Sequence, residues 1–459
     1  GASMAEAAAK PLLDPTAPVN SFGTDTKPEP ARAHEGLTFD QAAMLKMRVM
    51  WMVKKHRERA LKDHPPVHAE GFAHIICILK AYWHIIASNY LNILLVFAPI
   101  AVISYSLKWA EQLTFIFSLL CICPLSWILG QATEELAMHT NQTVGGLLNA
   151  TFGNAVELIV SILALKASLY DVVQASLLGS ILGNLLLVLG TAFIWGGMKY
   201  KEQTFNALAA QTNSSLLLMA VFGVIVPAAY NPKSIHLFVP TWRRFGAQAG
   251  DDNPDILHIS RLTAIVLLVI YILFLIFQLK THAQLYDEGG DDGDEEAEEP
   301  TLSVPAALVL LLLATGIVSY EAELLVDSIK ATASEWHLPR KFIGLIILPI
   351  AGNVAEHVTA ITVARKNKME LALGVAVGSS TQIALSVIPA LVLIGWCMDR
   401  SLSLDFQVFE TSIMVVSVLI VNTVCSNGRS NWLEGTMLLG GYIIVAIAFY
   451  YHPPDPSNP

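Results

Sequence analysis

The sequence predicts an all-α polytopic membrane protein with eleven transmembrane helices, arranged as one extra helix followed by two inverted five-helix repeats. Three observations predict this fold. The 459-residue chain is 54% hydrophobic and only 14% charged, whereas about a quarter of the residues are charged in soluble domains. Eleven apolar segments approach or exceed the length of about 20 helical residues that crosses a bilayer. Two of these segments carry the same short motif.

The first part of the chain is a polar tail, residues 1–72, which we expect on the cytoplasmic side. Within it, residues 39–62 combine Met, Leu and Val with Lys and Arg, the basic residues lying at 46–62, a pattern typical of a helix on an anionic membrane surface. Residues 73–110 contain a second amphipathic helix and the first span, near 91–107. The first 90 residues contain eleven Lys and Arg, which favours a cytoplasmic N-terminus. The later short loops add no support, because they carry seven Lys and Arg residues on the cytoplasmic side and ten on the opposite side.

Ten further spans follow, and their long apolar runs without alternation predict helices rather than a barrel. The first repeat, residues 111–280, contains spans near 112–130, 143–165, 172–196, 206–229 and 262–279. An acidic cytoplasmic linker, residues 281–303, precedes the second repeat, residues 304–452. That repeat contains spans near 304–320, 342–364, 371–397, 411–425 and 435–451, and a short tail, residues 453–459, ends the chain.

An internal repeat defines the architecture. Residues 145–157 read GGLLNATFGNAVE, and residues 344–356 read GLIILPIAGNVAE. The Gly-Asn pairs of these motifs are 199 residues apart, and so are the later Gly-Ser pairs at 179–180 and 378–379. Because each repeat has an odd number of spans, the second enters the membrane from the opposite side. Such inverted repeats are typical of secondary transporters.

Glu157 and Glu356 are the only acids deep in the apolar spans, at equivalent positions of the two repeats. An intramembrane charge costs roughly 2.5–3.5 kcal/mol on insertion scales, which favours a functional role. Inverted packing would bring both carboxylates together near the midplane. We expect the other ligands to be neutral side-chain oxygens and backbone carbonyls that local unwinding frees. The candidate residues are Asn154, Asn353, Gly153, Gly352, Ser180, Asn184, Ser379 and Gln382. This oxygen set suits calcium rather than zinc.

Three other groups are candidates for supporting roles. His357, beside Glu356, is either a proton-coupling group or a hydrogen-bonded partner of the site. Glu134 and Glu323 occur in matching contexts where spans two and seven end, so we predict cation or proton entrances at opposite faces, against ordinary interfacial solvation. The acidic stretch at 287–299 is a solvated linker, a weak calcium collector or a clasp for the basic tail. Its candidate residues are Asp291, Asp292, Asp294, Glu295, Glu296, Glu298 and Glu299.

The net charge of −10 comes almost entirely from that stretch, which holds nine acids in thirteen residues. The charge therefore gives no sign of nucleic-acid binding. The expected partners are calcium and protons as substrates and membrane lipid, while the oligomeric state stays open. The five cysteines lie in apolar segments, so we expect free thiols rather than a disulfide framework.

The motifs GNAVELIVSILAL and GNVAEHVTAI resemble the two signature repeats of the calcium/proton exchangers, within the cation/calcium antiporter superfamily. The resemblance covers residues 75–451, including ATEELA at 132–137 and LALGVAVGSS at 371–380, and is strongest with the fungal vacuolar members. It implies eleven helices, a calcium site at Glu157 and Glu356, and a vacuolar membrane location. It implies no prosthetic group, since calcium is the substrate.

The charges of the two glutamates suggest how exchange becomes obligatory. With both ionised the site carries two negative charges, which one Ca²⁺ or two protons neutralise. The empty charged site is too costly to move through a low-dielectric barrier. The expected function is exchange of cytosolic calcium for luminal protons by alternating access.

A sodium/calcium exchanger is the alternative, although neutral residues at 180, 184, 379 and 382 weaken it. A calcium channel is disfavoured because a channel needs rings of acids, usually from several subunits. An enzyme is disfavoured because no nucleophile–base arrangement occurs in the spans.

Overall fold

The apolar segments form helices in the computed structural model, which describes residues 72–230, 254–283 and 300–452. Within these residues, eight helices are long and apolar enough to cross a membrane, and three bent helix pairs raise the number to eleven. The predicted eleven-helix membrane fold is therefore confirmed. The basic segment at 46–62 and the acidic stretch at 287–299 lie outside the described residues.

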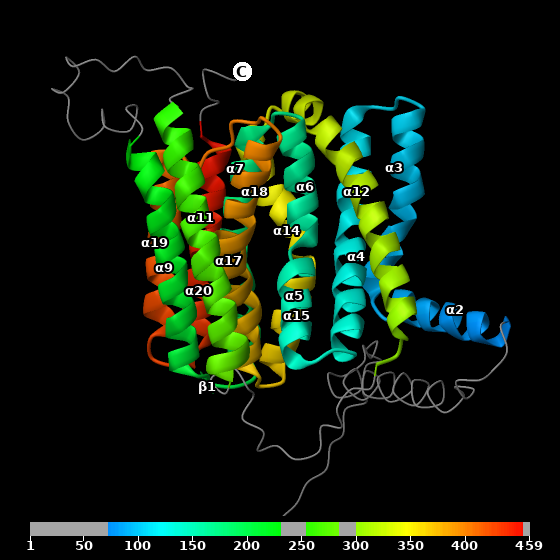
Figure 1. The fold of residues 1–459 in the computed structure, drawn as a ribbon, viewed down its shortest axis with the longest axis horizontal. Coiled ribbons are helices and arrows are strands. Elements are labelled where there is room, and N and C mark those ends of the chain that lie inside the picture. The colour runs from blue at the N-terminus through cyan, green and yellow to red at the C-terminus, as the bar shows by residue number, and fades with distance from the viewer. Residues whose placement is uncertain (1–71, 231–253, 284–299, 453–459) are drawn as a thin grey trace, which may run out of the picture. The chain divides into compact units, whose positions relative to one another are not determined.

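The first described helix does not continue into the first span. Helix α2 (Phe72–Ala87) is followed by η1 (Tyr90–Val96) and α3 (Phe97–Ser106), with a bend of 103° between α2 and the span. The side chain of Asn89 caps η1 by accepting a hydrogen bond from the Leu91 amide at 3.0 Å. In Figure 1, α2 lies across the direction of the other helices. This is the arrangement expected of an amphipathic helix that precedes a span.

Each of the two repeats consists of the following helical segments and one short strand. The first repeat contains α4 (Glu111–Met138), α5 (Gln142–Phe152), α6 (Ala155–Lys166), α7 (Tyr170–Leu182), η2 (Gly183–Val188), α8 (Leu189–Gly197), β1 (Gln203–Thr204), α9 (Ala207–Tyr230), α11 (Pro254–Ile276) and η3 (Phe277–Thr281). The second contains α12 (Val304–Glu335), α13 (Arg340–Phe342), η5 (Ile343–Ile347), α14 (Leu348–Gly352), α15 (Val354–Arg365), α16 (Met369–Leu373), η6 (Gly374–Gly378), α17 (Ser379–Gln382), η7 (Ile383–Val387), α18 (Ile388–Cys397), α19 (Val408–Cys425), β2 (Arg429–Ser430) and α20 (Trp432–Tyr450).

The connections between spans alternate between two faces of the helix bundle. We call the linker face the one where α11–η3 ends and α12 begins. Strands β1 and β2 pair antiparallel on this face, with Gln203 opposite Ser430. The His139 ring also donates to the Leu302 carbonyl at 2.6 Å, which places the end of α4 beside the start of α12. The other face, reached by residues 107–110, 167–169, 336–339 and 398–407, is called the opposite face.

Helices α4 and α12 form a long antiparallel pair, which shows the opposite orientation of the two repeats (Figure 1). Both extend beyond their predicted spans, α4 to Met138 and α12 to Glu335. The extensions carry both apolar and charged residues. Their charges set the ends of the predicted apolar spans, although the helices themselves continue.

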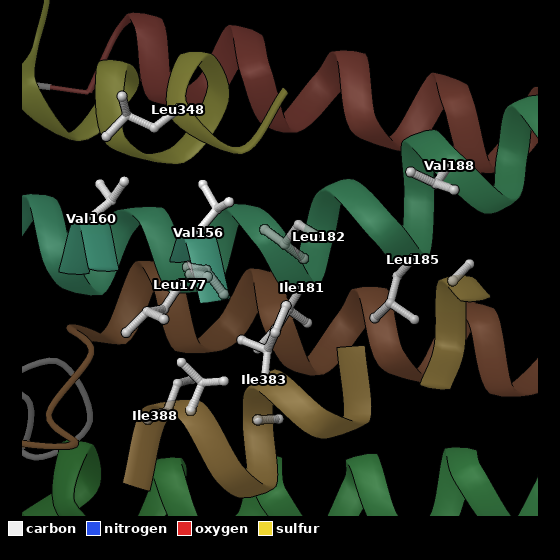
Figure 2. Packing of buried hydrophobic residues seen from close by; sticks show 14 of the residues in the cluster. Val156, Val160, Leu177, Ile181, Leu182, Leu185, Val188, Leu348, Ile383 and Ile388 are labelled. Carbon is white, nitrogen blue, oxygen red and sulfur yellow. The ribbon is translucent and has the colours of Figure 1, made fainter. Parts of the chain in front are cut away.

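The core lies where the two repeats meet. Figure 2 shows aliphatic side chains of α6, α7 and η2 packed with Leu348, Ile383 and Ile388 of the second repeat. The wide helical turns of η2 and η7 occur at equivalent repeat positions, directly after the Gly-Ser segments. Within the described residues, the predicted free thiols are confirmed for Cys121, Cys123, Cys397 and Cys425.

Candidate cation site

Two helices break at the repeated Gly-Asn motif. The axis bends by 42° between α5 and α6, and by 56° between α13–α14 and α15. Asn154 (φ −108°, ψ 23°) and Asn353 (φ −88°, ψ 17°) interrupt the helical backbone at these breaks. Each break therefore creates a new helix N-terminus inside the bundle, where the helix dipole carries partial positive charge.

Glu157 and Glu356 lie in the first turns of the helices that start at these breaks. Glu157 is 8% exposed and Glu356 is half-buried. A Cβ atom on Gly352 would lie 3.1 Å from Glu157 Oε1, so the second broken helix passes close to the first carboxylate. The structure thus brings together the two acids that the repeat predicts.

The polar residues of the two repeats hydrogen-bond to each other across the centre. Asn154 Nδ2 donates to Gln382 Oε1 at 3.0 Å, and Ser379 Oγ donates to Asn154 Oδ1 at 3.4 Å. Asn184 Nδ2 donates to Ser379 Oγ at 3.1 Å. In the reverse direction, Asn353 Nδ2 donates to the backbone carbonyl of Ser180 at 3.3 Å. Each broken helix is therefore held by the Gly-Ser segment of the other repeat.

Several oxygens at this centre have no donor. Among the described residues, Asn184 Oδ1, Asn353 Oδ1 and Glu356 Oε2 are buried and accept no hydrogen bond. Buried polar atoms are normally paired, so three unsatisfied acceptors in one network require an explanation. A hard cation would supply one, because Ca²⁺ prefers carboxylate and amide oxygens. The described part of the chain has no cluster of three His, Cys, Asp or Glu side chains, so neutral oxygens would have to complete such a site.

A small cavity reaches Glu157. It measures about 20 Å³, which is room for about one water molecule. Ser176 and Ser180 of α7, Val160 of α6 and Gly352 of α14 are among its lining residues. Val160 and Ser176 lie closer to the opposite face than Glu157 and Ser180 do, because α6 ends and α7 begins at that face. The cavity therefore extends from Glu157 toward the opposite face.

The other predicted residues lie apart from this centre. His357 Nε2 lies 3.0 Å from Thr191 Oγ1 of α8, so this ring nitrogen is engaged by another helix. Glu134 is exposed near the linker-face end of α4, where Gln131 donates to it at 3.1 Å. Glu323 is exposed on α12, but its predicted position at the end of that helix is wrong. Packing against α4 extends α12 by about three turns beyond Glu323.

Three buried glutamates were missed because they lie outside the predicted apolar runs: Glu135, Glu321 and Glu410, the last of which forms an ion pair of 2.7 Å with Lys341. Glu135 is 8% exposed and accepts hydrogen bonds from the Thr301 and Leu302 amides, which lie just before α12. Glu321 is only 1% exposed, in the α4–α12 interface. The sequence holds a signal for Glu321, since it continues the spacing of Val318 and Leu325, both buried on the same helix face.

The chain is similar to a set of known transporters. A family profile described as sodium/calcium exchanger protein matches residues 111–280 and 306–451. A vacuolar calcium ion transporter of Schizosaccharomyces pombe is 41% identical, over 85% of this chain and 91% of its own length. A Ca²⁺/H⁺ antiporter of Aphanothece halophytica is 43% identical, over 79% of this chain and 97% of its own length. The vacuolar cation/proton exchanger 5 of Arabidopsis thaliana is 42% identical, over 83% and 85% of the two chains.

Solved structures show the same fold. Native YfkE superposes with a TM-score of 0.66 at 36% identity, covering 79% of this chain and all of that one (100%). The H⁺/Ca²⁺ exchanger CAX has a TM-score of 0.59 at 14% identity, covering 81% and 93% of the two chains, and supports the fold alone. The profile match in both repeats, the relatives above 40% identity and the shared architecture agree. The chain therefore belongs to the sodium/calcium exchanger protein family.

Proposed function

We propose that the protein is a secondary active antiporter that exchanges cytosolic calcium for luminal protons at a site centred on Glu157 and Glu356. The observation that carries this proposal is the pair of symmetric carboxylates beside buried oxygens that accept no hydrogen bond. The names of the relatives supply the substrate class: calcium ion transporter, Ca²⁺/H⁺ antiporter and cation/proton exchanger. The role is transport rather than enzymatic catalysis.

Exchange follows from competition for the same oxygens. Two ionised carboxylates give the site two negative charges, and one Ca²⁺ cancels them. Protonation of both carboxylates also cancels them and removes the anionic ligands that calcium needs. An acidic compartment therefore releases calcium and reloads the site with protons. The empty, charged site cannot cross the apolar core, because moving an uncompensated charge through it is too costly.

The remaining site residues have assigned roles in this proposal. Asn154, Asn353, Ser180, Asn184, Ser379 and Gln382 supply neutral oxygens or hold those oxygens in place, and Gly153 and Gly352 allow the backbone to approach the ion. For His357 the contact with Thr191 supports a positioning role rather than direct proton exchange with Glu356. Glu134 and Glu323 would concentrate cations at the two faces.

We also propose a location and an orientation. The vacuolar relatives support a multi-pass protein of the vacuolar membrane. The eleven Lys and Arg residues in the first 90 positions support a cytoplasmic N-terminus. The linker face is then cytosolic, and the opposite face meets the acidic lumen.

The test is uptake of ⁴⁵Ca into vesicles that contain the purified protein and an imposed pH gradient. We expect uptake when the interior is acidic, loss of uptake when a protonophore collapses the gradient, and no effect of Na⁺. Uptake that needs a sodium gradient and persists without a pH gradient would establish sodium/calcium exchange instead. Calcium flux without any counter-ion would identify a channel.

A further inference from the structure

Four basic side chains gather at the linker face, where helices α8 and α15 end. Lys199 and Lys201 follow α8, whereas Arg365 and Lys366 lie at the end of α15. We call these four residues the basic patch. All four are exposed, and none of them forms an ion pair with another residue in the described part of the chain. Their positive charges are therefore available to a ligand.

Hydrogen bonds between the two segments hold the basic patch together. Lys199 Nζ donates to the Arg365 carbonyl at 2.9 Å. The buried side chain of Gln203 donates from Nε2 to the Ala364 carbonyl at 2.9 Å and to Asn367 Oδ1 at 3.0 Å. Strand β1, labelled at this face in Figure 1, contains Gln203 and pairs with β2. The fold itself thus keeps the two basic segments side by side.

Exposed aromatic side chains lie around the basic patch. Trp195 of α8 is 42% exposed, and the guanidinium carbon of Arg365 lies 5.5 Å from its ring centroid. Lys199 Nζ lies 5.0 Å from the ring centroid of Tyr200. Trp432, the first residue of α20, is 55% exposed and packs against the end of α8. Because Trp and Tyr are enriched where transmembrane helices meet water, the patch lies at the level of the lipid headgroups.

The basic patch has hydrogen-bond donors left for an anion. The guanidinium of Arg365 carries five N–H donors, and none of them bonds to another described residue. Lys199 uses one of its three N–H groups on a backbone carbonyl, and the side chains of Lys201 and Lys366 donate to no described residue. Glu202, the acid of the same loop, pairs at 3.3 Å with an arginine outside the patch. Charged donors in this arrangement suit phosphate oxygens.

We propose that the basic patch binds the phosphate headgroup of an anionic lipid in the leaflet at the linker face. Basic pockets between transmembrane helices commonly bind such headgroups. A lipid fits better than the acidic stretch at 287–299, because acyl chains can cover the exposed rings of Trp195 and Trp432. The acidic stretch consists of Asp, Glu, Gly and one Ala, so it has no large apolar group to place there. Headgroup binding does not depend on which ions the protein exchanges.

The test is lipid binding by the full chain, purified in detergent and followed by native mass spectrometry. A phosphatidylinositol monophosphate should stay bound to the wild-type protein, and phosphatidylcholine should not. The double variant Lys201→Gln/Lys366→Gln should bind the phosphoinositide at least about tenfold more weakly, since each basic residue near an anionic surface contributes about fivefold in affinity. The matched control is Lys108→Gln/Lys330→Gln, which removes two exposed charges at a distance from the patch and should bind like wild type.

A second measurement separates lipid binding from folding. Neither Lys201 nor Lys366 makes a side-chain hydrogen bond to a described residue, so the double variant should have the wild-type thermal midpoint without lipid. Addition of the phosphoinositide should raise the midpoint of the wild-type protein and leave that of the double variant unchanged.

Four results would overturn the proposal. Equal phosphoinositide binding by the wild type and the double variant would place the lipid elsewhere. Equally tight binding of phosphatidylcholine would show lipid contact without recognition of a headgroup. Displacement of the lipid by inorganic phosphate at the same concentration would identify a site for free phosphate. Lipid binding that appears only after neutralisation of the acidic stretch at 287–299 would assign the patch to that stretch.

Discussion

Glu157 and Glu356 occupy equivalent residues, yet their surroundings differ, since Glu157 is buried and Glu356 is half-buried. Replacing either by Gln keeps the size and removes one of the two charges that balance Ca²⁺. We expect proton-driven ⁴⁵Ca uptake to fall to background for Glu157→Gln and for Glu356→Gln, while the protein still inserts and purifies. Glu111→Gln, an exposed change at the start of α4, is the matched control. Robust uptake by Glu157→Gln would place the cation elsewhere.

Glu134 and Glu323 allow a sided test at the same scale, because both are exposed, Glu134 near the linker-face end of α4 and Glu323 in the half of α12 nearer the opposite face. Glu134→Gln should weaken apparent calcium affinity at the linker face alone, and Glu323→Gln at the opposite face alone. Salt screens exposed charges beyond about 8 Å, so each change should be a few-fold at most and smaller in high salt. Kinetic measurements in both transport directions check this. Unchanged affinity in both variants would leave interfacial solvation as their only role.

At the scale of elements, the contact of α7 with η5 depends on Gly179. A Cβ atom at this position would lie 2.1 Å from the Leu345 carbonyl oxygen, so a larger residue requires the two backbones to separate. Close helix approach through small residues is a common means of association in membranes. We expect Gly179→Ala to lower stability by about 1–3 kcal/mol, as overpacking does. The readout is the thermal midpoint of the purified protein.

Gly316→Ala is the control for this element, because nothing lies within 4 Å of a Cβ atom there. Alanine in an open helical position should leave stability unchanged or raise it by up to about 1 kcal/mol. Equal midpoints for the two variants would mean that α7 and η5 can separate without cost.

At the scale of the whole molecule, the acidic stretch at 287–299 lies between the two repeats and carries nine of the 38 acidic residues of the chain. Neutralising it removes charge from the linker without touching the cation site. We expect a modest change in the calcium or salt dependence of uptake, since dispersed charges are screened, and no change in proton coupling. Calcium and salt titrations of uptake give the measurement. Identical titrations would define the stretch as a connector alone, and lost coupling would contradict a purely intramembrane mechanism.

The sequence by itself determined the number of spans, the inverted repeat and the pair Glu157 and Glu356. Spans are readable because lipid demands long apolar helices, and a duplicated motif at one offset needs no coordinates. Glu157 and Glu356 stand out because an acid inside such a run is rare.

Only the tertiary structure decided which polar groups meet and which stay unpaired. The bonds of Asn154 to Gln382 and of Asn353 to Ser180 join residues more than 170 positions apart, and no local pattern specifies them. The burial of Glu321 likewise depends on α4 covering one face of α12, where the sequence shows only a charged helix extension. Hydropathy indicates whether a segment as a whole prefers lipid or water. The partners of a buried charge depend instead on packing between distant helices.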